Sequence, residues 1–381
     1  MKFHKQLLRA ACLSLGLCIF ACEPSEVSQE KITSVAHSPV KRQSIGNCWL
    51  YAQATWLESM LKTTTGEDIN VSETYWTYWD FYGKLVRNEP IPDEEFPTGG
   101  GWKKSVSLIN TYGWLKEDEF IPEEKDFVMS KAQACAVAYI QDQGKEGGTL
   151  FDVSQRTPEL IRQELDKGFS CKGKYKFDMN TAYKNRHLAS STMLVDVKTR
   201  EVQSLKTWLG LWQEASVSGG NNWGRYEGKK LPTEAELVNY KKIEQRIKRA
   251  LNDHQPVLLS WFVSFNASNE KGLFNLSTLA QTGELGRSGG HMIVLYDYTV
   301  TDVPGRGTLP EGDLSDDEKA LALFGNLEYL VVKNSWGADR PDRPWLGNGY
   351  SRLSWDYLTG RYDNEGVFST FIRGVILPPG Y

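Results

Sequence analysis

The spacing of the apolar residues changes near residue 256 of this 381-residue chain, and this change constrains the fold more than any other feature. Before it, apolar positions recur every three or four residues, as in 48–61 and 237–251, which is typical of helices. After it come three segments of strand length: 256–263, which is a run of large apolar residues, and 291–300 and 327–336, which are bounded by glycines. Helices collected in the first part and strands in the second predict an α+β fold with two unlike lobes.

The N-terminal segment has the pattern of an export signal. Basic residues within 1–10 precede a short apolar run that ends at Cys22, and the run is too short for a comfortable membrane span. Its end resembles a bacterial lipoprotein signal, although Phe20 is bulkier than such signals usually have. We therefore expect a signal peptide at 1–21, a polar tether at 22–38 and a lipid anchor on Cys22, facing the periplasm or the cell exterior. The alternatives are a protein that is secreted or otherwise anchored, and a protein that is not exported.

The overall composition and charge indicate which kinds of molecule the protein is expected to bind. The chain is 40% apolar and 24% charged, with a formal net charge of -4, which is ordinary for a folded soluble protein. A nucleic-acid-binding protein would carry a basic patch or stripe, so we expect no nucleic-acid partner. We also expect no metal and no cofactor. The oligomeric state is not predicted.

Six cysteines are present, and two of them lie within the predicted signal peptide. Cleavage before Cys22 would leave that residue with Cys48, Cys135 and Cys171. In an oxidising envelope Cys135 and Cys171 could pair, which would leave Cys48 as a free thiol. The alternative is that Cys135 and Cys171 are two separate small apolar residues.

Cys48 occupies a position that favours reactivity. Asn47 is a good N-cap residue, so Cys48 is expected to be the first residue of a helix. The free N–H groups and the dipole of a helix N-terminus favour negative charge, which predicts a lowered thiol pKa, and the thiolate is the nucleophilic form. The alternative is a small apolar residue in a core.

Three polar side chains elsewhere fit the needs of a nucleophilic thiol. His291 opens a strand directly after a flexible Arg-Ser-Gly-Gly stretch, and Asn334 ends another strand. An asparagine amide can hold the far nitrogen of an imidazole, and Trp336 could shield that bond from water. The Gln43 amide could donate to a developing oxyanion together with the Cys48 backbone N–H. Each residue taken alone is more often structural.

The order Gln43, Cys48, His291, Asn334 resembles that of the papain-like cysteine peptidases. The segments that carry the resemblance are SPVKRQSIGNCWLYA, GGGWKKSVSLINTYGWLKEDEF, GGHMIVLYDY, VVKNSWG and WLGNGYSRL. The resemblance implies one papain-like domain at 39–381, with insertions near 171–230 and 302–326. It also implies a two-lobed fold, in which a helical lobe with a long central helix faces a sheet or barrel-like lobe.

The resemblance also implies roles for individual residues. Cys48 would be the nucleophile, His291 the general base and then acid, and Asn334 the residue that orients His291. Gln43 and the Cys48 N–H would form the oxyanion hole, with Trp49 and Trp336 in support. The candidates for the substrate cleft are Gly99, Gly100 and Gly290. The reaction implied is hydrolysis of a peptide or protein substrate through a thioester acyl-enzyme.

The chain also departs from the family. The gap from Gln43 to Cys48 is one residue shorter than usual, and Ile45 stands where the family has a cysteine. We expect no long prosegment of the family's kind between Cys22 and Pro39, so that either latency is unnecessary or the insertion near 171–230 covers the cleft. A weaker similarity to bleomycin hydrolase is present. Two alternative functions stay open: a catalytically silent protein that binds peptides or a partner, and a thiol enzyme that transfers an amide.

Overall fold

A computed structural model describes residues 35, 38–176, 185–196, 198–215, 226–227, 231–312, 314–338, 349–364 and 367–381. The chain divides after residue 30, and all described residues belong to the second unit, 31–381. The predicted signal peptide, Cys22, most of the tether, parts of the predicted insertion at 171–230 and residues 345–348 of the WLGNGYSRL segment lie outside the described residues.

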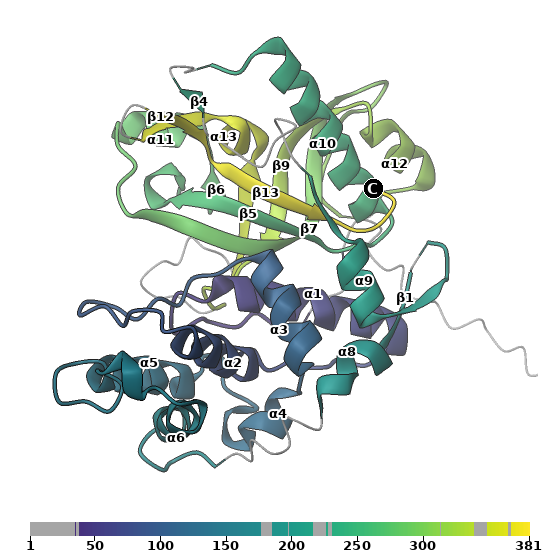
Figure 1. Ribbon diagram of the computed structural model, residues 1–381. Coiled ribbons are helices and arrows are strands. Elements are labelled where there is room, and N and C mark those ends of the chain that lie inside the picture. Colours follow the sequence, from purple (N-terminus) through teal and green to yellow (C-terminus); the bar gives the residue numbers. More distant parts are fainter. Residues whose placement is uncertain are drawn as a thin grey trace, which may run out of the picture. The chain divides into compact units, whose positions relative to one another are not determined.

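Helices dominate the first part of the described chain (Figure 1). The longer ones are α1 (Cys48–Thr65), α2 (Glu73–Val86), α3 (Trp102–Tyr112), α5 (Lys131–Gln143) and α6 (Pro158–Phe169). The short ones are α4 (Glu117–Phe120), α8 (Leu188–Ser191), α9 (Leu205–Leu211) and the single turns η1 (Pro122–Glu124), η2 (Val153–Gln155) and η3 (Asn185–His187). A small hairpin of β1 (Met193–Val195) and β2 (Val202–Ser204) lies between α8 and α9.

The second part forms an eight-stranded sheet within the described residues, in the order β3-β13-β5-β7-β9-β10-β6, with β8 also paired to β7. Its strands are β3 (Gln213–Ala215), β5 (Val257–Ser264), β6 (Leu273–Phe274), β7 (Ser288–Val303), β8 (Gly307–Leu309), β9 (Asn326–Lys333), β10 (Tyr350–Ser354) and β13 (Ile372–Leu377). The pairs are antiparallel except that of β6 with β10, which is parallel.

The remaining elements accompany this sheet. A three-stranded sheet has the order β11-β12-β4 and is formed by β4 (Tyr226–Glu227), β11 (Arg361–Asn364) and β12 (Val367–Thr370). The helices are α10 (Glu234–Asn252), α11 (Leu276–Thr282), α12 (Asp316–Ala322) and α13 (Trp355–Thr359), with the turn η4 (Phe265–Ala267). None of the described helices combines the length and the apolar character that crossing a membrane requires.

The large sheet separates two hydrophobic cores. Successive side chains of a strand point to opposite faces, and β7 shows this alternation. Met292 and Val294 belong to the core that contains α1 and α2, whereas Ile293 and Leu295 belong to the core that contains α10. Helix α1 packs against β7, and its residues from Cys48 to Leu61 are all buried. The N-terminus of α1 is thereby held against the sheet.

The predicted α+β class is confirmed. The three expected strands correspond to β5, the first part of β7 and β9, each within a few residues of its expected bounds. The predicted insertion at 302–326 contains β8 and α12. The described parts of 171–230 contain short elements that the sequence analysis did not anticipate, among them α8 and α9.

Candidate active site

Cys48 is the first residue of α1, and two backbone pairings bring the segment before it to the segment after Asn334. The Gln43 N–H donates to the Ser335 carbonyl at 2.9 Å, and the Gly337 N–H donates to the Lys41 carbonyl at 3.1 Å. Residues separated by almost 300 positions in sequence are thus joined as in a short antiparallel ladder. The start of α1 is therefore fixed relative to the end of β9.

The sulfur of Cys48 lies against the strand that carries His291. The backbone N–H groups of Met292, Trp49 and Cys48 itself act to lower the pKa of the thiol. Burial has the larger and opposite effect, because the side chain is only 9% exposed, and it raises the pKa of the Cys48 thiol to about 11. The expectation of a lowered thiol pKa was therefore wrong, since desolvation outweighs the helix N-terminus.

Asn47 precedes α1 as expected, but its side chain does not cap the helix. The amide nitrogen donates instead to Thr77 Oγ1 at 2.9 Å and to Gln133 Oε1 at 3.0 Å, and all three residues are buried. The predicted helix start at Cys48, with Asn47 as its N-cap residue, is confirmed, and the Asn47 side chain bonds to α2 and α5 because they offer buried acceptors. The first N–H groups of α1 are therefore not satisfied by the Asn47 side chain.

His291 and Asn334 lie within hydrogen-bonding distance, with 2.7 Å between Nε2 and Oδ1. The orientation of the amide is set by its other contacts, because Oδ1 also accepts from the Ser335 N–H at 2.8 Å and Nδ2 faces Ser351 Oγ at 3.4 Å. Since a carbonyl oxygen only accepts, Nε2 of His291 carries the proton in the neutral ring. The other nitrogen, Nδ1, is then the basic one.

Aromatic rings surround the imidazole. Trp336 stacks on His291 with 4.7 Å between ring centroids and 25° between planes, and Trp261 meets it edge-on at 6.1 Å. Burial lowers the pKa of His291 to about 4, while the hydrogen bond to Asn334 acts in the opposite direction. The ring is therefore neutral at physiological pH.

Gln43 lies beside these residues, but its amide is partly engaged. Its Nε2 donates to the Ile45 carbonyl at 2.8 Å, and its Oε1 accepts from Ser335 Oγ at 2.6 Å. The second contact ties Gln43 to the neighbour of Asn334. The first uses one of the two amide N–H groups within the loop that precedes Cys48.

The glycine candidates differ in what they do. A side chain at Gly100 would overlap the Trp49 ring, since a Cβ there would lie 2.3 Å from it. Trp49 also donates to the Thr98 carbonyl at 3.0 Å, so the segment 98–100 lies beside the start of α1. Gly99 and Gly290 are exposed, and a Cβ at either would meet no atom within 4 Å. A side chain at either of these two positions would therefore enter open space.

The sequence analysis missed a buried ionic cluster behind these residues. Lys333, which precedes Asn334, donates to Ser38 Oγ at 2.7 Å and to Thr55 Oγ1 at 3.1 Å. Burial lowers its pKa to about 8. Nearby, Lys41 pairs with Glu73 at 2.7 Å. The lysine in the VVKNSWG segment was the one sequence feature that could have indicated this cluster. The carboxylates come from separate helices, so no local pattern connects them with the lysine.

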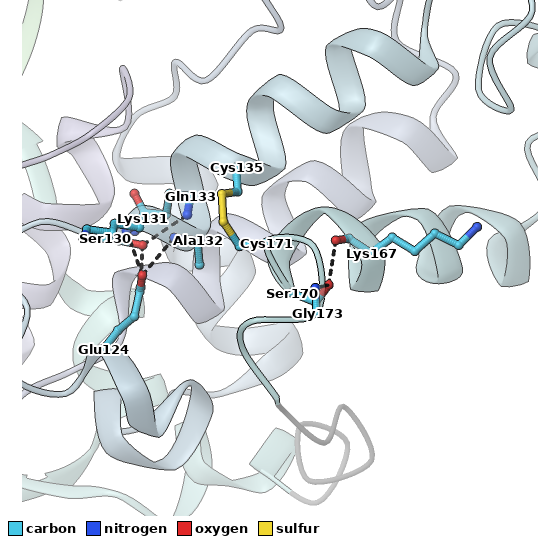
Figure 2. The surroundings of a disulfide bond; sticks show 10 residues. All are labelled: Glu124, Ser130, Lys131, Ala132, Gln133, Cys135, Lys167, Ser170, Cys171 and Gly173. Atoms are coloured by element: carbon cyan, nitrogen blue, oxygen red, sulfur yellow. Dashed lines mark hydrogen bonds between the residues drawn. A yellow bond between two sulfur atoms is a disulfide. The ribbon is translucent and has the colours of Figure 1, made fainter.

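Cys135 and Cys171 form a disulfide that joins α5 to the end of α6 (Figure 2). The sequence left open whether Cys135 and Cys171 pair or are two separate apolar residues, and in the structure they pair. Cys48 is the free cysteine among the described residues. The start of α5 is further fixed by Glu124, which accepts from Ser130 Oγ at 2.6 Å and from the N–H groups of the first turn (Figure 2).

The described residues contain no group of three or more histidine, cysteine or acidic side chains that could hold a metal ion. No protein-family model matches the chain, and no curated protein matches it. Among solved structures, the chain is similar to PepW from Lactobacillus rhamnosis, with 13% identity and a TM-score of 0.44 over 90% of this chain and 80% of that one. The similarity is distant.

Proposed function

We propose that this protein is a papain-like cysteine peptidase that hydrolyses peptide bonds through a thioester acyl-enzyme. One arrangement carries the proposal. The backbone N–H of Met292, the residue after His291, acts to lower the pKa of the Cys48 thiol, while Nε2 of His291 lies 2.7 Å from Oδ1 of Asn334. A thiol whose pKa is influenced by the strand that carries an oriented imidazole supports a role in nucleophilic catalysis.

In the proposed first step, His291 acts as the general base. Burial raises the pKa of the Cys48 thiol and lowers that of His291, so the resting site holds a neutral thiol and a neutral imidazole. Nδ1 takes the thiol proton while the sulfur attacks the substrate carbonyl carbon. The resulting imidazolium keeps its Nε2–H bond to Asn334, which stabilises the charged ring.

The carbonyl oxygen becomes negatively charged as the C–S bond forms. In the proposed oxyanion hole the backbone N–H of Cys48 donates to this oxygen, and the absence of a capping hydrogen bond from the Asn47 side chain supports that role. The second N–H of Gln43 would supply a side-chain donor. A single such donor typically contributes about 3 kcal/mol to transition-state stabilisation.

The intermediate then breaks at the C–N bond. The imidazolium gives its proton to the leaving amine, which departs with the C-terminal part of the peptide, and the acyl group stays on Cys48 as a thioester. His291 next takes a proton from water, whose oxygen attacks the thioester. The released sulfur recovers the proton, so that the cycle consumes one water and one peptide bond.

Cleavage of a mixed peptide library tests the proposal. The full-length protein is compared with its Cys48→Ala form, and new N-termini are identified by mass spectrometry. We expect cleavage by the wild-type protein and a loss of at least about 10⁴-fold in the variant, because the nucleophile is absent. Equal cleavage by both forms would exclude Cys48 as the nucleophile.

The burial of Cys48 favours a second candidate, a catalytically silent protein that binds peptides. Alkylation by iodoacetamide separates the two candidates. An active pair predicts that Cys48 reacts fast near neutral pH in the wild-type protein and at least about tenfold slower in His291→Ala, since His291 would remove the thiol proton. Equal rates in both forms, rising only near pH 11, would indicate a silent site.

We also propose that the protein is exported and anchored through a lipid on Cys22. The proposal rests on the basic and apolar pattern of 1–21 and on the cysteine that follows it. Expression in a bacterial host with a radiolabelled fatty acid tests it. We expect label in the membrane fraction for the wild-type protein and none for Cys22→Ser. Unlabelled wild-type protein in the cytoplasm would contradict both export and anchoring.

A further inference from the structure

We propose that the leaving-group side of the site binds a carboxylate of the substrate through Arg42 and Arg287. The inference rests on the proposed peptidase function. It deepens that function by naming a substrate class: peptides with a carboxylate one or two residues after the scissile bond.

An aromatic shelf continues outward from His291. Trp336 stacks on the imidazole, and Phe265 follows Trp336 with 5.1 Å between ring centroids. Because His291 delivers the proton to the leaving amine, the departing part of the peptide lies on the same side as this shelf. Trp336 and Phe265 therefore border the path of the residues that follow the scissile bond.

Arg42 stands at the inner end of the shelf. Arg42 and Trp336 form an isolated antiparallel bridge, and residues directly opposite in such a pair project to the same face. The stem of Arg42 lies along Gly337, where an added Cβ would come within 3.2 Å of the Arg42 Cβ. The packed stem limits the directions that the guanidinium can take.

Arg287 stands at the outer end. Its guanidinium lies 5.8 Å from the centroid of the Phe265 ring, and its carbonyl accepts from the Phe265 N–H at 3.0 Å. Arg287, Gly289 and His291 are every second residue of the extended backbone that leads into β7, so they lie on the same face of it. A Cβ at Gly289 would meet no atom within 4 Å, so the space between the arginine and the imidazole is open.

The spacing suits a short peptide segment. His291 comes four positions after Arg287, a distance of about 13 Å along an extended chain. Two substrate residues cover about 7 Å of this distance. The arginine side chain covers the remainder. Among the described residues, no ion pair or hydrogen bond engages the guanidinium of Arg42 or of Arg287. Two cationic groups with unused donors beside an aromatic surface are suited to a carboxylate.

The test uses a peptide that the wild-type protein cleaves, resynthesised with Glu or Gln at the second position after the scissile bond. We expect kcat/KM to be about fivefold higher for Glu, mainly through KM, because a partly exposed ion pair contributes to ground-state binding. The preference should disappear in Arg287→Gln and weaken in Arg42→Gln. It should persist in Arg306→Gln, which alters an exposed arginine beyond the other end of β7.

A second pair of peptides distinguishes the two sources of a carboxylate. Both end two residues after the scissile bond and carry Gln there, one with a free C-terminus and one amidated. A preference for the free form that Arg287→Gln abolishes assigns the site to the chain terminus. A preference for the Glu side chain alone assigns it to acidic residues. Equal kcat/KM within both pairs would overturn the proposal.

Binding to full-length Cys48→Ala separates a failure of this inference from a failure of the proposed function. If the wild-type protein cleaves no peptide, the same four peptides are compared by calorimetry. Tighter binding of the carboxylate forms, lost in Cys48→Ala/Arg287→Gln, would support the carboxylate site although hydrolysis had failed. Equal affinities would overturn the site whether or not the protein is a peptidase.

Discussion

The helical side and the sheet side of the candidate site hold their reactive groups by different means. On the helical side, the turn before Cys48 is fixed by buried amides and hydroxyls, because Asn47 reaches Thr77 on α2 and Gln133 on α5. On the sheet side, His291 is fixed by its strand, by the Trp336 ring and by one hydrogen bond to Asn334. On the helical side, the position of the turn before Cys48 depends on individual hydrogen bonds. On the sheet side, the protonation of His291 depends on the apolar residues that cover its ring.

The difference has a physical reason. A helix N-terminus presents several unpaired N–H groups, so the chain just before it is placed by polar contacts. A strand has its backbone groups paired with its neighbours, and its side chains are then free to sit among rings. We expect substitutions on the two sides to change different measured quantities. Four substitutions test this, in order of decreasing expected effect.

Replacing His291 by alanine should have the largest effect. Loss of the general base should lower kcat/KM by about 10²- to 10⁴-fold while the protein stays folded, because the ring contributes one hydrogen bond and one stacked face. Steady-state kinetics with a cleaved peptide and circular dichroism would measure this. Asn334→Ala should lower kcat/KM by a smaller factor, because it disturbs the orientation of His291 but leaves the base in place. An equal or larger loss in Asn334→Ala would contradict the assignment of His291 as the base.

Removing the disulfide should change stability and leave activity intact. The Cys135→Ser/Cys171→Ser variant opens a link between residues 36 apart in sequence, which we expect to lower the free energy of unfolding by about 2–4 kcal/mol. Urea denaturation would measure the loss. We expect kcat/KM at 25 °C to change by less than about twofold, because Glu124 and Ser130 still fix the start of α5. A folded but inactive variant would show that the disulfide itself positions the nucleophile.

Replacing Gln133 by leucine tests the helical side directly. Asn47 Nδ2 would lose one of its two buried acceptors, at a cost of about 1–3 kcal/mol in the free energy of unfolding. We expect kcat to fall about tenfold while the pH dependence stays the same, because the turn before Cys48 loosens and His291 is untouched. Gln141→Leu is the matched control, since Gln141 lies on the same helix and bonds to Pro92 instead. Equal effects of both variants on kcat would contradict the positioning role.

Replacing Trp336 by alanine tests the sheet side and should lower kcat/KM near neutral pH less than the substitution of His291 or of Gln133. Burial is what lowers the pKa of His291 to about 4, so uncovering the ring should raise that pKa toward its ordinary value of 6.5. In the proposed mechanism the neutral ring is the active form, so a higher pKa means that activity is lost at a higher pH as the solution is acidified. We expect the acid limb of the kcat/KM profile to move upward, with less than tenfold loss above pH 7. Trp336→Phe should keep the limb near pH 4, and an unmoved limb in Trp336→Ala would contradict this account.

Local pattern was enough to predict much of the fold and the place of several site residues. The start of α1 at Cys48 and the strands that carry His291 and lead to Asn334 follow from apolar spacing and helix-start residues, which act over a few positions. The structure then brings His291 to Asn334 at 2.7 Å. The catalytic roles of these residues stay predictions until they are tested by substitution.

Tertiary structure alone decided the electrostatics and the polar contacts of the site. Burial, which no local pattern reports, raised the pKa of Cys48 and lowered that of His291, against the expectation drawn from the helix N-terminus. The Asn47 side chain does not cap its own helix, because Gln133, 86 residues further on, offers a buried acceptor. The amino-acid sequence determined which groups the site could contain. Packing between distant segments determined their protonation and their partners, because desolvation and hydrogen bonding depend on neighbours in space.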